Sequence, residues 1–186
     1  MSPMIWETNR LILRSFQYID VQPFAAYRSD AAIAKFQYWD IPFTEEKAAK
    51  FIEEIEGIQP GIPGEWYQIA IALKTTHQLI GDCAFCILAE DSQQAEIGFT
   101  LARQYQGKGY GNEAVTRLLD YLFDELNLHR VRAICHVENL AAAKLLERVG
   151  MRREGEFIEN IYFKGEWISE YWYGILHREW SAKRDR

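Results

Sequence analysis

The sequence lacks any apolar stretch near the length of a membrane-spanning helix, which needs about 20 residues. Its first residues also lack the positively charged start and apolar run of a secretory signal. We therefore expect a cytoplasmic protein without a membrane partner.

Cysteine is scarce, and basic residues are outnumbered by acidic ones. The 3 cysteines, an odd number, fit a reducing compartment better than a disulfide framework, so we predict no bridge. The 21 Lys and Arg against 27 Asp and Glu give a net charge of -6. This balance argues against nucleic-acid binding, which needs a concentrated field of positive charge. An acidic surface would instead attract a cationic substrate such as a protonated amine.

Proline and glycine are too few for a fibrous or disordered chain, with 5 Pro and 12 Gly scattered over 186 residues. The length is enough for one domain with a substantial core and short for two. We predict a single domain over residues 1–186, with its core at about 8–180.

Hydrophobic periodicity predicts an α/β protein. Residues 10–16 alternate as a strand, residues 18–35 show helical spacing, and a capped amphipathic helix runs from Thr44 to Gly57. Three strand-like runs separated by short polar turns then predict an antiparallel meander at residues 66–73, 79–88 and 96–101. The remaining predicted elements are a helix at 109–126, a strand at 130–137, a helix at 139–149, strands at 154–163 and 167–176, and a frayed end at 181–186.

The segment that says most about function is residues 106–112, here called the glycine loop, with glycine at positions 107, 109 and 111. It lies between a predicted strand and a strongly amphipathic helix. Helix starts leave N–H groups unpaired and carry a positive partial charge, and glycine lets phosphate oxygens approach these amides. We expect an anion-binding loop, although a flexible turn would have a similar composition. A P-loop would need Ser or Thr after Lys108, and the dinucleotide fingerprint has a different glycine spacing.

The glycine loop resembles the coenzyme A pyrophosphate signature of the GNAT acetyltransferase superfamily, with Gln106, Gly109 and Gly111 at its defining positions. Residues 96–101 resemble the family's fourth strand, and residues 138–151 resemble its Asn-containing helix. Residues 7–14 and 173–180 are similar to the ends of the RimJ/RimL branch, which acetylates protein N-termini and other amines. The resemblance covers nearly the whole chain. It implies a mixed, twisted, mostly antiparallel sheet of about seven strands with helices on both faces.

The resemblance also implies where acetyl-coenzyme A would bind. Backbone groups of Phe99, Thr100 and Leu101 would hold the pantetheine arm between two splayed strands, and a nearby N–H would stabilise the thioester oxyanion. The loop amides would bind the pyrophosphate, and Lys108 could either add charge or stay solvated. The complete predicted cofactor-binding set is Phe99, Thr100, Leu101, Gln106, Gly107, Lys108, Gly109, Tyr110, Gly111, Asn112 and Asn139.

Glu96 is the candidate general base. An amine must lose a proton before it attacks the thioester, and Glu96 begins the strand expected to line the acetyl site. The alternative is a strand-end glutamate with a structural partner. Asn139 follows a strand and opens a helix, so its default role is an N-cap, which would still allow contact with the cofactor.

Two positions depart from the family pattern. Members often carry a Ser, three residues after this Asn, that protonates the leaving thiolate, and this sequence has Ala142 there. RimL-type enzymes tend to have a Glu in the sixth strand, where this sequence has Ile161, with Glu159 close by. The identity of the general acid is therefore open, and the alternatives are Tyr105, Tyr110 and water.

Neither cysteines nor histidines form a metal-binding pattern. Cys83 and Cys86 have a C-x-x-C spacing, but inside a strand their side chains should point to opposite faces. The four histidines are dispersed, and we predict no metal site. Aromatic residues that could line an acceptor groove or belong to the core are Phe36, Tyr38, Trp39, Phe43, Trp66 and Tyr67.

The expected function is direct acetyl transfer from acetyl-coenzyme A to a primary amine, such as a protein N-terminus of the ribosomal-protein type. One alternative is an acetyltransferase for a small amine or antibiotic. Another is a non-catalytic acyl-coenzyme A binding regulator, since Ala142 and Ile161 stand where acid or base residues are expected. The sequence leaves open whether the protein forms a homodimer through its last two predicted strands.

Overall fold

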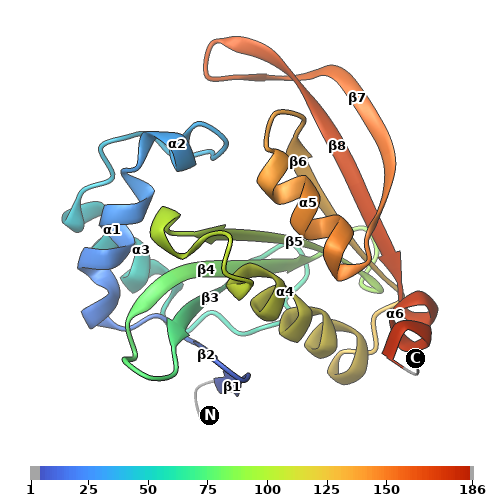
Figure 1. Ribbon diagram of the computed structural model, residues 1–186, viewed down its shortest axis with the longest axis horizontal. Coiled ribbons are helices and arrows are strands. Elements are labelled where there is room, and N and C mark those ends of the chain that lie inside the picture. Colours follow the sequence, from blue (N-terminus) through green and yellow to red (C-terminus); the bar gives the residue numbers. More distant parts are fainter. Residues whose placement is uncertain (1–4, 185–186) are drawn as a thin grey trace.

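The centre of the molecule is one eight-stranded sheet, seen in the computed structural model that describes residues 5–184 (Figure 1). The strand order is β1-β2-β3-β4-β5-β6-β8-β7, and every described pair is antiparallel except β5 with β6. The predicted α/β fold with a mostly antiparallel sheet is therefore confirmed. The sheet has eight strands and not about seven, because a three-residue strand, Ile5–Glu7, pairs along one edge.

The strands are β1 Ile5–Glu7, β2 Leu11–Arg14, β3 Trp66–Leu73, β4 Leu79–Ile87, β5 Gln94–Leu101, β6 Arg130–His136, β7 Arg152–Phe163 and β8 Glu166–Leu176. The helices are α1 Val21–Arg28, α2 Ala31–Ala34, α3 Glu45–Ile55, α4 Tyr110–Asp120, α5 Leu140–Val149 and α6 His177–Arg184. A π-helical turn, Tyr121–Glu125, continues α4. Short 3-10 turns lie at Tyr18–Asp20 and Arg103–Tyr105. Within residues 5–184, no helix combines the length and the apolar character needed to cross a membrane.

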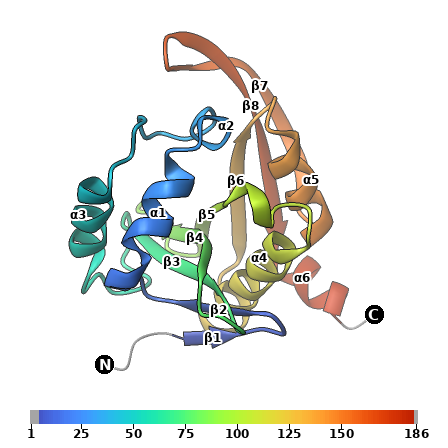
Figure 2. The ribbon, with the colours of Figure 1, turned by 60° about the vertical axis from the view of Figure 1, so that its left-hand side comes forward.

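Helices cover both faces of the sheet, as Figure 2 shows. Along β3, Ile69 and Ile71 pack into the larger core with α4, α5 and α6, while Ala70 between them faces α1 and α3. This alternation follows from the two-residue period of a strand. Two separate cores result, one on each face of the same sheet.

Two predictions about helices need correction. The helical spacing over residues 18–35 forms a 3-10 turn and two helices, because Asp30 accepts a hydrogen bond from the Ala32 N–H and starts α2. The frayed end predicted for 181–186 is wrong for residues 181–184, which continue α6; residues 185–186 lie outside the described part. Trp180, only 2% exposed, anchors this helix in the larger core.

The strands β5 and β6 separate after a short parallel pairing. Their register joins Gln94–Glu96 to Arg130–Arg132 and then stops. Beyond this point β5 continues beside β4, and β6 continues beside β8. The sheet therefore divides at its centre, with Glu96 and Arg132 as the last paired residues.

Candidate active site

The divergence of β5 and β6 exposes backbone groups along two facing strand edges. Residues 97–101 of β5 and 133–136 of β6 do not pair with each other. Unpaired strand edges bind extended chains through main-chain hydrogen bonds. The gap can therefore hold a linear group that carries amides, and pantetheine has that chemistry.

A cavity of about 330 Å³ opens at this gap. The residues from the end of β5, the glycine loop and the start of α5 that line it include Phe99, Thr100, Leu101, Gln106, Gly107, Gly109, Gly111, Asn112 and Asn139. Of the predicted cofactor set, only Lys108 and Tyr110 do not line it. Lys144 and Arg148 of α5 line it as well, and neither was among the predicted site residues. Their spacing of four residues puts both on one helix face, which is the signal that could have found them.

The glycines of the loop meet different structural demands. Gly107 and Gly109 have φ angles of 73° and 83°, in the left-handed region that favours glycine. A Cβ on Gly111 would lie 2.5 Å from Leu145 Cδ1, so this glycine allows α4 and α5 to approach closely. The first turn of α4 therefore begins beside the cavity, where its leading N–H groups have no helical partner.

Arg10 holds the glycine loop from its outer side. Its Nη1 donates to the Lys108 carbonyl at 2.9 Å, its Nε donates to Glu113 Oε2 at 2.7 Å, and its guanidinium lies 4.4 Å from the centre of the Tyr110 ring. Glu113 also accepts hydrogen bonds from Thr8 Oγ1 and the Arg10 N–H. Burial tends to raise the pKa of the Glu113 carboxyl, but the hydrogen bonds from Thr8 and Arg10 outweigh it and lower the pKa. The Tyr110 ring is thus engaged by Arg10 outside the cavity.

Two asparagines line the cavity, and their side-chain oxygens differ in hydrogen bonding. Asn139 Oδ1 accepts from the Ala142 N–H at 3.2 Å, which confirms its role as the N-cap of α5. Asn112 Oδ1 is buried and has no hydrogen-bond partner in the described part of the chain. Because a buried acceptor without a partner is costly, Asn112 is suited to a ligand that supplies a donor. This unsatisfied oxygen fits an amide-bearing or hydroxyl-bearing group such as coenzyme A.

Glu96 has the structural partner that the alternative reading required. Its Oε2 accepts from Arg132 Nε at 2.9 Å, and the two side chains are 22% and 26% exposed. The Arg132 guanidinium in turn lies 5.4 Å from the centre of the Trp172 ring. The carboxylate is therefore fixed where the gap begins, next to the backbone expected to hold the thioester.

The β7–β8 hairpin leans over the sheet toward α2 (Figure 1), and its tip is tied to that segment. Lys164 Nζ donates to the carbonyls of Ala34 and Trp39 at 2.7 and 2.8 Å. The rings of Tyr38 and Phe163 pack edge to face with centroids 5.2 Å apart. The segment after α2 and the hairpin tip thus form an arch on the side of the gap away from α4.

The six aromatic residues proposed for an acceptor groove divide between the core and the surface. Phe43 and Tyr67 are buried, Phe36 lines the cavity, Trp39 packs on Arg28, and Tyr38 and Trp66 are 76% and 40% exposed. Of these, Phe36 lines the cavity and Tyr38 belongs to the arch beside the gap.

None of the three cysteines lines the cavity, although Cys86 lies opposite Glu96 in the β4–β5 ladder. Cys83 packs in the larger core and Cys86 lies on the opposite face of β4, as the strand period predicted. Both are free, as is Cys135, and burial raises the pKa of the Cys135 thiol to about 11. Within residues 5–184, no three His, Cys, Asp or Glu side chains are grouped to hold a metal ion.

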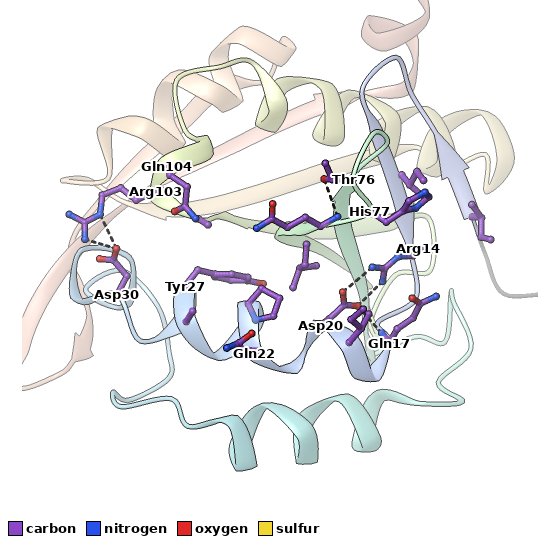
Figure 3. A pocket seen from close by; sticks show the side chains of 18 of the residues that line it. Arg14, Gln17, Asp20, Gln22, Tyr27, Asp30, Thr76, His77, Arg103 and Gln104 are labelled. Carbon is purple, nitrogen blue, oxygen red and sulfur yellow. Dashed lines mark hydrogen bonds and ion pairs between the residues drawn. The ribbon is translucent and has the colours of Figure 1, made fainter.

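A second, wider cavity of about 960 Å³ lies between α1, β2 and the β3–β4 turn (Figure 3). None of the predicted cofactor-binding residues lines it. Its charged side chains all have partners: Arg14 pairs with Asp20, Arg103 with Asp30, and Glu7 with Lys74. Because these charges are compensated, we assign the cavity no catalytic role.

Comparison with known proteins agrees with the geometry of the gap. The family model described as "Acetyltransferase (GNAT) domain" matches residues 10–152. YnaD of Bacillus subtilis, named as an uncharacterized N-acetyltransferase, is 36% identical over 177 residues, covering 94% of this chain and 98% of its own length.

Solved structures show the same fold. An acetyltransferase of the GNAT family from Bacillus anthracis is 33% identical with a TM-score of 0.81, covering 94% of this chain and 99% of its own. Spermidine N-acetyltransferase from Vibrio cholerae, in complex with CoA and spermine, is 22% identical with a TM-score of 0.77, covering 94% and 99%. The chain belongs to the GNAT acetyltransferase family and is an N-acetyltransferase.

Proposed function

We propose that this protein transfers the acetyl group of acetyl-coenzyme A directly to a primary amine, with the coenzyme bound in the gap between β5 and β6. The observation that carries the proposal is one cavity that joins the unpaired edge of β5, the start of α4 and the unsatisfied Asn112 Oδ1. GNAT acetyltransferases use acetyl-coenzyme A, and the spermidine N-acetyltransferase of similar fold was solved with CoA.

Each part of the coenzyme has a matching group on this chain. Backbone groups of residues 97–101 are available to the amides of pantetheine. The amides at the start of α4 suit the pyrophosphate because they are unpaired and at the positive end of the helix. Lys144 and Arg148 add two positive charges at the same cavity. Lys108 is left as a surface charge 5.7 Å from the Tyr105 ring.

Bound acetyl-coenzyme A supplies an activated thioester carbonyl. Transfer forms a bond between the acceptor nitrogen and the acetyl carbon and breaks the carbon–sulfur bond. An ammonium ion has no free electron pair, so it must first lose a proton, and we assign its acceptance to Glu96, directly or through a water. Arg132 holds this carboxylate in place through the 2.9 Å hydrogen bond. A backbone N–H of β5 would stabilise the oxyanion.

The departing thiolate gains a proton from water in this scheme. Ala142 has no hydroxyl, the Tyr110 ring is engaged by Arg10, and Tyr105 Oη donates to Gln78 Oε1 at 3.0 Å. Neither tyrosine lines the cavity. Water is the remaining donor that needs no rearrangement of these side chains.

The acceptor is a primary amine that is protonated in solution. The likeness of the chain ends to the RimJ/RimL branch supports a protein N-terminus of the ribosomal-protein type. The spermidine N-acetyltransferase of similar fold supports a small amine as the second candidate. Both carry an ammonium group, and a net charge of -6 favours their approach.

We also propose that the protein acts in the cytoplasm, since Cys83, Cys86 and Cys135 are free thiols. A second copy could pair along β7, an edge strand that exposes Ile158 and Tyr162 at 77% and 61%. Light scattering would show whether a dimer forms.

The test is acetyl-coenzyme A binding by calorimetry, followed by thiol release in the presence of amines. Gly109→Trp should weaken binding about tenfold or more, because glycine is needed at a φ of 83° and a Cβ there would lie 3.2 Å from Nη2 of Arg10, the side chain that holds the loop. Gly57→Trp is the matched control, with a φ of 85° at a position outside the cavity, and should bind normally. Absence of binding by the unchanged protein would contradict the proposal. Binding without thiol release from any amine would favour the regulatory alternative.

A further inference from the structure

Glu170 on β8 is a buried carboxylate that lacks a cationic partner. It is 7% exposed, and its one hydrogen bond comes from Asn160 Nδ2 to Oε2 at 2.7 Å. Within residues 5–184, no Lys, Arg or His forms an ion pair with it. Burying a carboxylate is costly unless a charge or several hydrogen bonds compensate it. One neutral amide donor leaves most of that cost unmet.

Glu170 and Glu96 lie on the same face of the sheet. In β8, Tyr171 and Tyr173 pack against the core that contains α4 and α5, so Glu170 points to the opposite face. In β5, Ile97 belongs to that same core, which puts Glu96 on the face with Glu170. The two carboxylates therefore flank β6 on the side that the arch covers.

Tyr38 brings a third polar group to this place from the arch. Although the residue as a whole is 76% exposed, partial burial of its hydroxyl, followed by the negative charges of Glu170 and Glu96, raises the pKa of Tyr38. Both carboxylates therefore lie within electrostatic reach of the hydroxyl. The contacts of Tyr38 with Phe163 and of Lys164 with the Ala34 and Trp39 carbonyls fix the arch above them. Three segments distant in sequence thus bring polar groups to the same side of β6.

The cationic side chains near Glu170 pair with other groups. Arg132 pairs with Glu96, and Lys35 pairs with Glu138 at 2.7 Å. His136, the residue opposite Glu170 in the ladder, accepts the Glu138 N–H with Nδ1 at 2.9 Å and forms no hydrogen bond with Glu170 in the described chain. None of these three groups pairs with Glu170.

A second unsatisfied group lies on the same face. Trp172 follows Glu170 by two residues, and its Nε1 is buried with no hydrogen-bond partner in the described chain. A buried indole N–H normally finds an acceptor. The uncompensated Glu170 carboxylate and the unpaired Trp172 N–H together indicate a site where a ligand supplies the missing partners.

We propose that Glu170 binds the ammonium group of the acceptor, an inference that rests on the proposed function. The buried carboxylate receives N–H donors from the protonated amine, which thereby lies on the side of β6 that also carries Glu96. One ammonium proton then passes to Glu96 or its water, and the free amine attacks the acetyl carbon. The second proton lost from nitrogen leaves through water while another water protonates the thiolate, so the products are the acetamide, the thiol and one proton.

Calorimetry on the coenzyme A-loaded protein tests this assignment. The probes are spermidine and the peptide Ala-Ala-Ala amide with a free N-terminus, and the N-acetylated peptide is the probe without an ammonium group. We expect at least one cationic probe to bind, and Glu170→Gln to weaken that binding about tenfold or more, since hydrogen bonds to charged groups have this effect. The N-acetylated peptide should bind equally to both forms. The matched control is Glu156→Gln, which removes the same charge from an exposed position on the same hairpin and should leave binding unchanged.

The outcomes separate the two proposals. Normal coenzyme A binding by Glu170→Gln, with cationic probes bound as tightly as before, overturns the role of Glu170. Failure of every cationic probe to bind the loaded wild-type protein overturns it as well. Absence of coenzyme A binding in the wild-type protein overturns the proposed function instead. Should Glu170→Gln not fold, Glu170→Asp keeps the charge; it should retain cation binding, and loss of that binding with coenzyme A still bound counts against the assignment.

Discussion

Glu96 combines a structural contact with the position of a base. Its ion pair with Arg132 joins β5 to β6 at the last rung before the gap. Partly exposed ion pairs contribute little to stability, on the order of 1 kcal/mol or less. The hydrogen bond uses Oε2, and Oε1 has no partner in the described chain. One oxygen therefore anchors the carboxylate while the other is available to a proton.

At this residue we predict that Glu96→Gln lowers the rate of acetyl transfer about 100-fold, because a positioned general base contributes at least that much. The amide oxygen of the variant can still accept the Arg132 hydrogen bond, so its coenzyme A affinity and its thermal unfolding midpoint should be unchanged. Thiol release at saturating acceptor measures the rate, and calorimetry measures the affinity.

Glu90→Gln is the control for this change, since Glu90 is an exposed acid in the turn between β4 and β5. It should leave the rate intact. An unchanged rate in Glu96→Gln together with a lowered thermal midpoint would assign Glu96 to structure alone.

Roles that depend on residues close in sequence were predictable, and contacts between residues distant in sequence were not. Asn139 caps α5 within three residues, so the helix start alone predicted it. Arg10 meets Glu113 across 103 positions, and no local pattern connects them. Glu170 was missed for the same reason. In sequence it is one acid in an alternating strand, and its isolation from cations appears only after folding.

At the scale of elements, the glycine loop and α4 depend on the first turn of the chain for support. Glu113 accepts from Thr8 and from both the backbone and the side chain of Arg10. These bonds fasten the start of α4 to the turn before β2. The loop geometry that faces the cavity thus depends on a contact on its opposite side.

This contact predicts a pH dependence of stability. Because the Thr8 and Arg10 bonds lower the folded pKa of Glu113 below 4.5 against the effect of burial, its contribution is complete above 4.5 and is lost as the pH falls through the folded pKa. Between pH 6 and pH 3, the free energy of unfolding should therefore fall more steeply for the wild-type protein than for Glu113→Gln. Urea titrations at each pH measure the difference.

Other carboxylates also lose stabilising bonds in acid, so the comparison between variants is what isolates Glu113. Glu125→Gln is a suitable reference, because Glu125 pairs with Arg117 on the same helical segment and is half exposed. Its curve should parallel that of the wild-type protein. A Glu113→Gln curve that also parallels the wild type would contradict the assignment.

The elements that the sequence predicted are those with a long periodic pattern. The meander of β3, β4 and β5 and the β5–α4–β6 crossover are confirmed because each contains enough residues for the period to show. Strand β1 has three residues, and α6 has no clear apolar stripe, so neither was predicted. Each is stabilised by its tertiary neighbours, which composition does not reveal.

On the scale of the whole molecule, the sheet has one helix-covered face on each side and divides at the gap where we propose that the coenzyme binds. The larger core fixes α4 and α5 on one face, and the smaller core fixes α1 and α3 on the other. The gap between β5 and β6 connects the two faces through the centre of the sheet. The family resemblance predicted that two neighbouring strands splay apart, whereas the arch beside the gap depends on the Lys164 contacts, which no sequence motif indicates.

The C-terminal helix closes the larger core, and Trp180 is its main contact. The indole is 2% exposed, packs 6.2 Å from the Phe123 ring and donates Nε1 to Asp120 Oδ1 at 3.2 Å. We predict that Trp180→Ala lowers the free energy of unfolding by about 3–5 kcal/mol, the usual cost of truncating a buried aromatic. Trp167→Ala, at a residue that is 60% exposed on β8, should cost far less. Urea unfolding followed by circular dichroism measures both. Because Trp180 is remote from the cavity lining, the folded variant should still bind coenzyme A, and equal losses in the two variants would mean that α6 is not part of the core in solution.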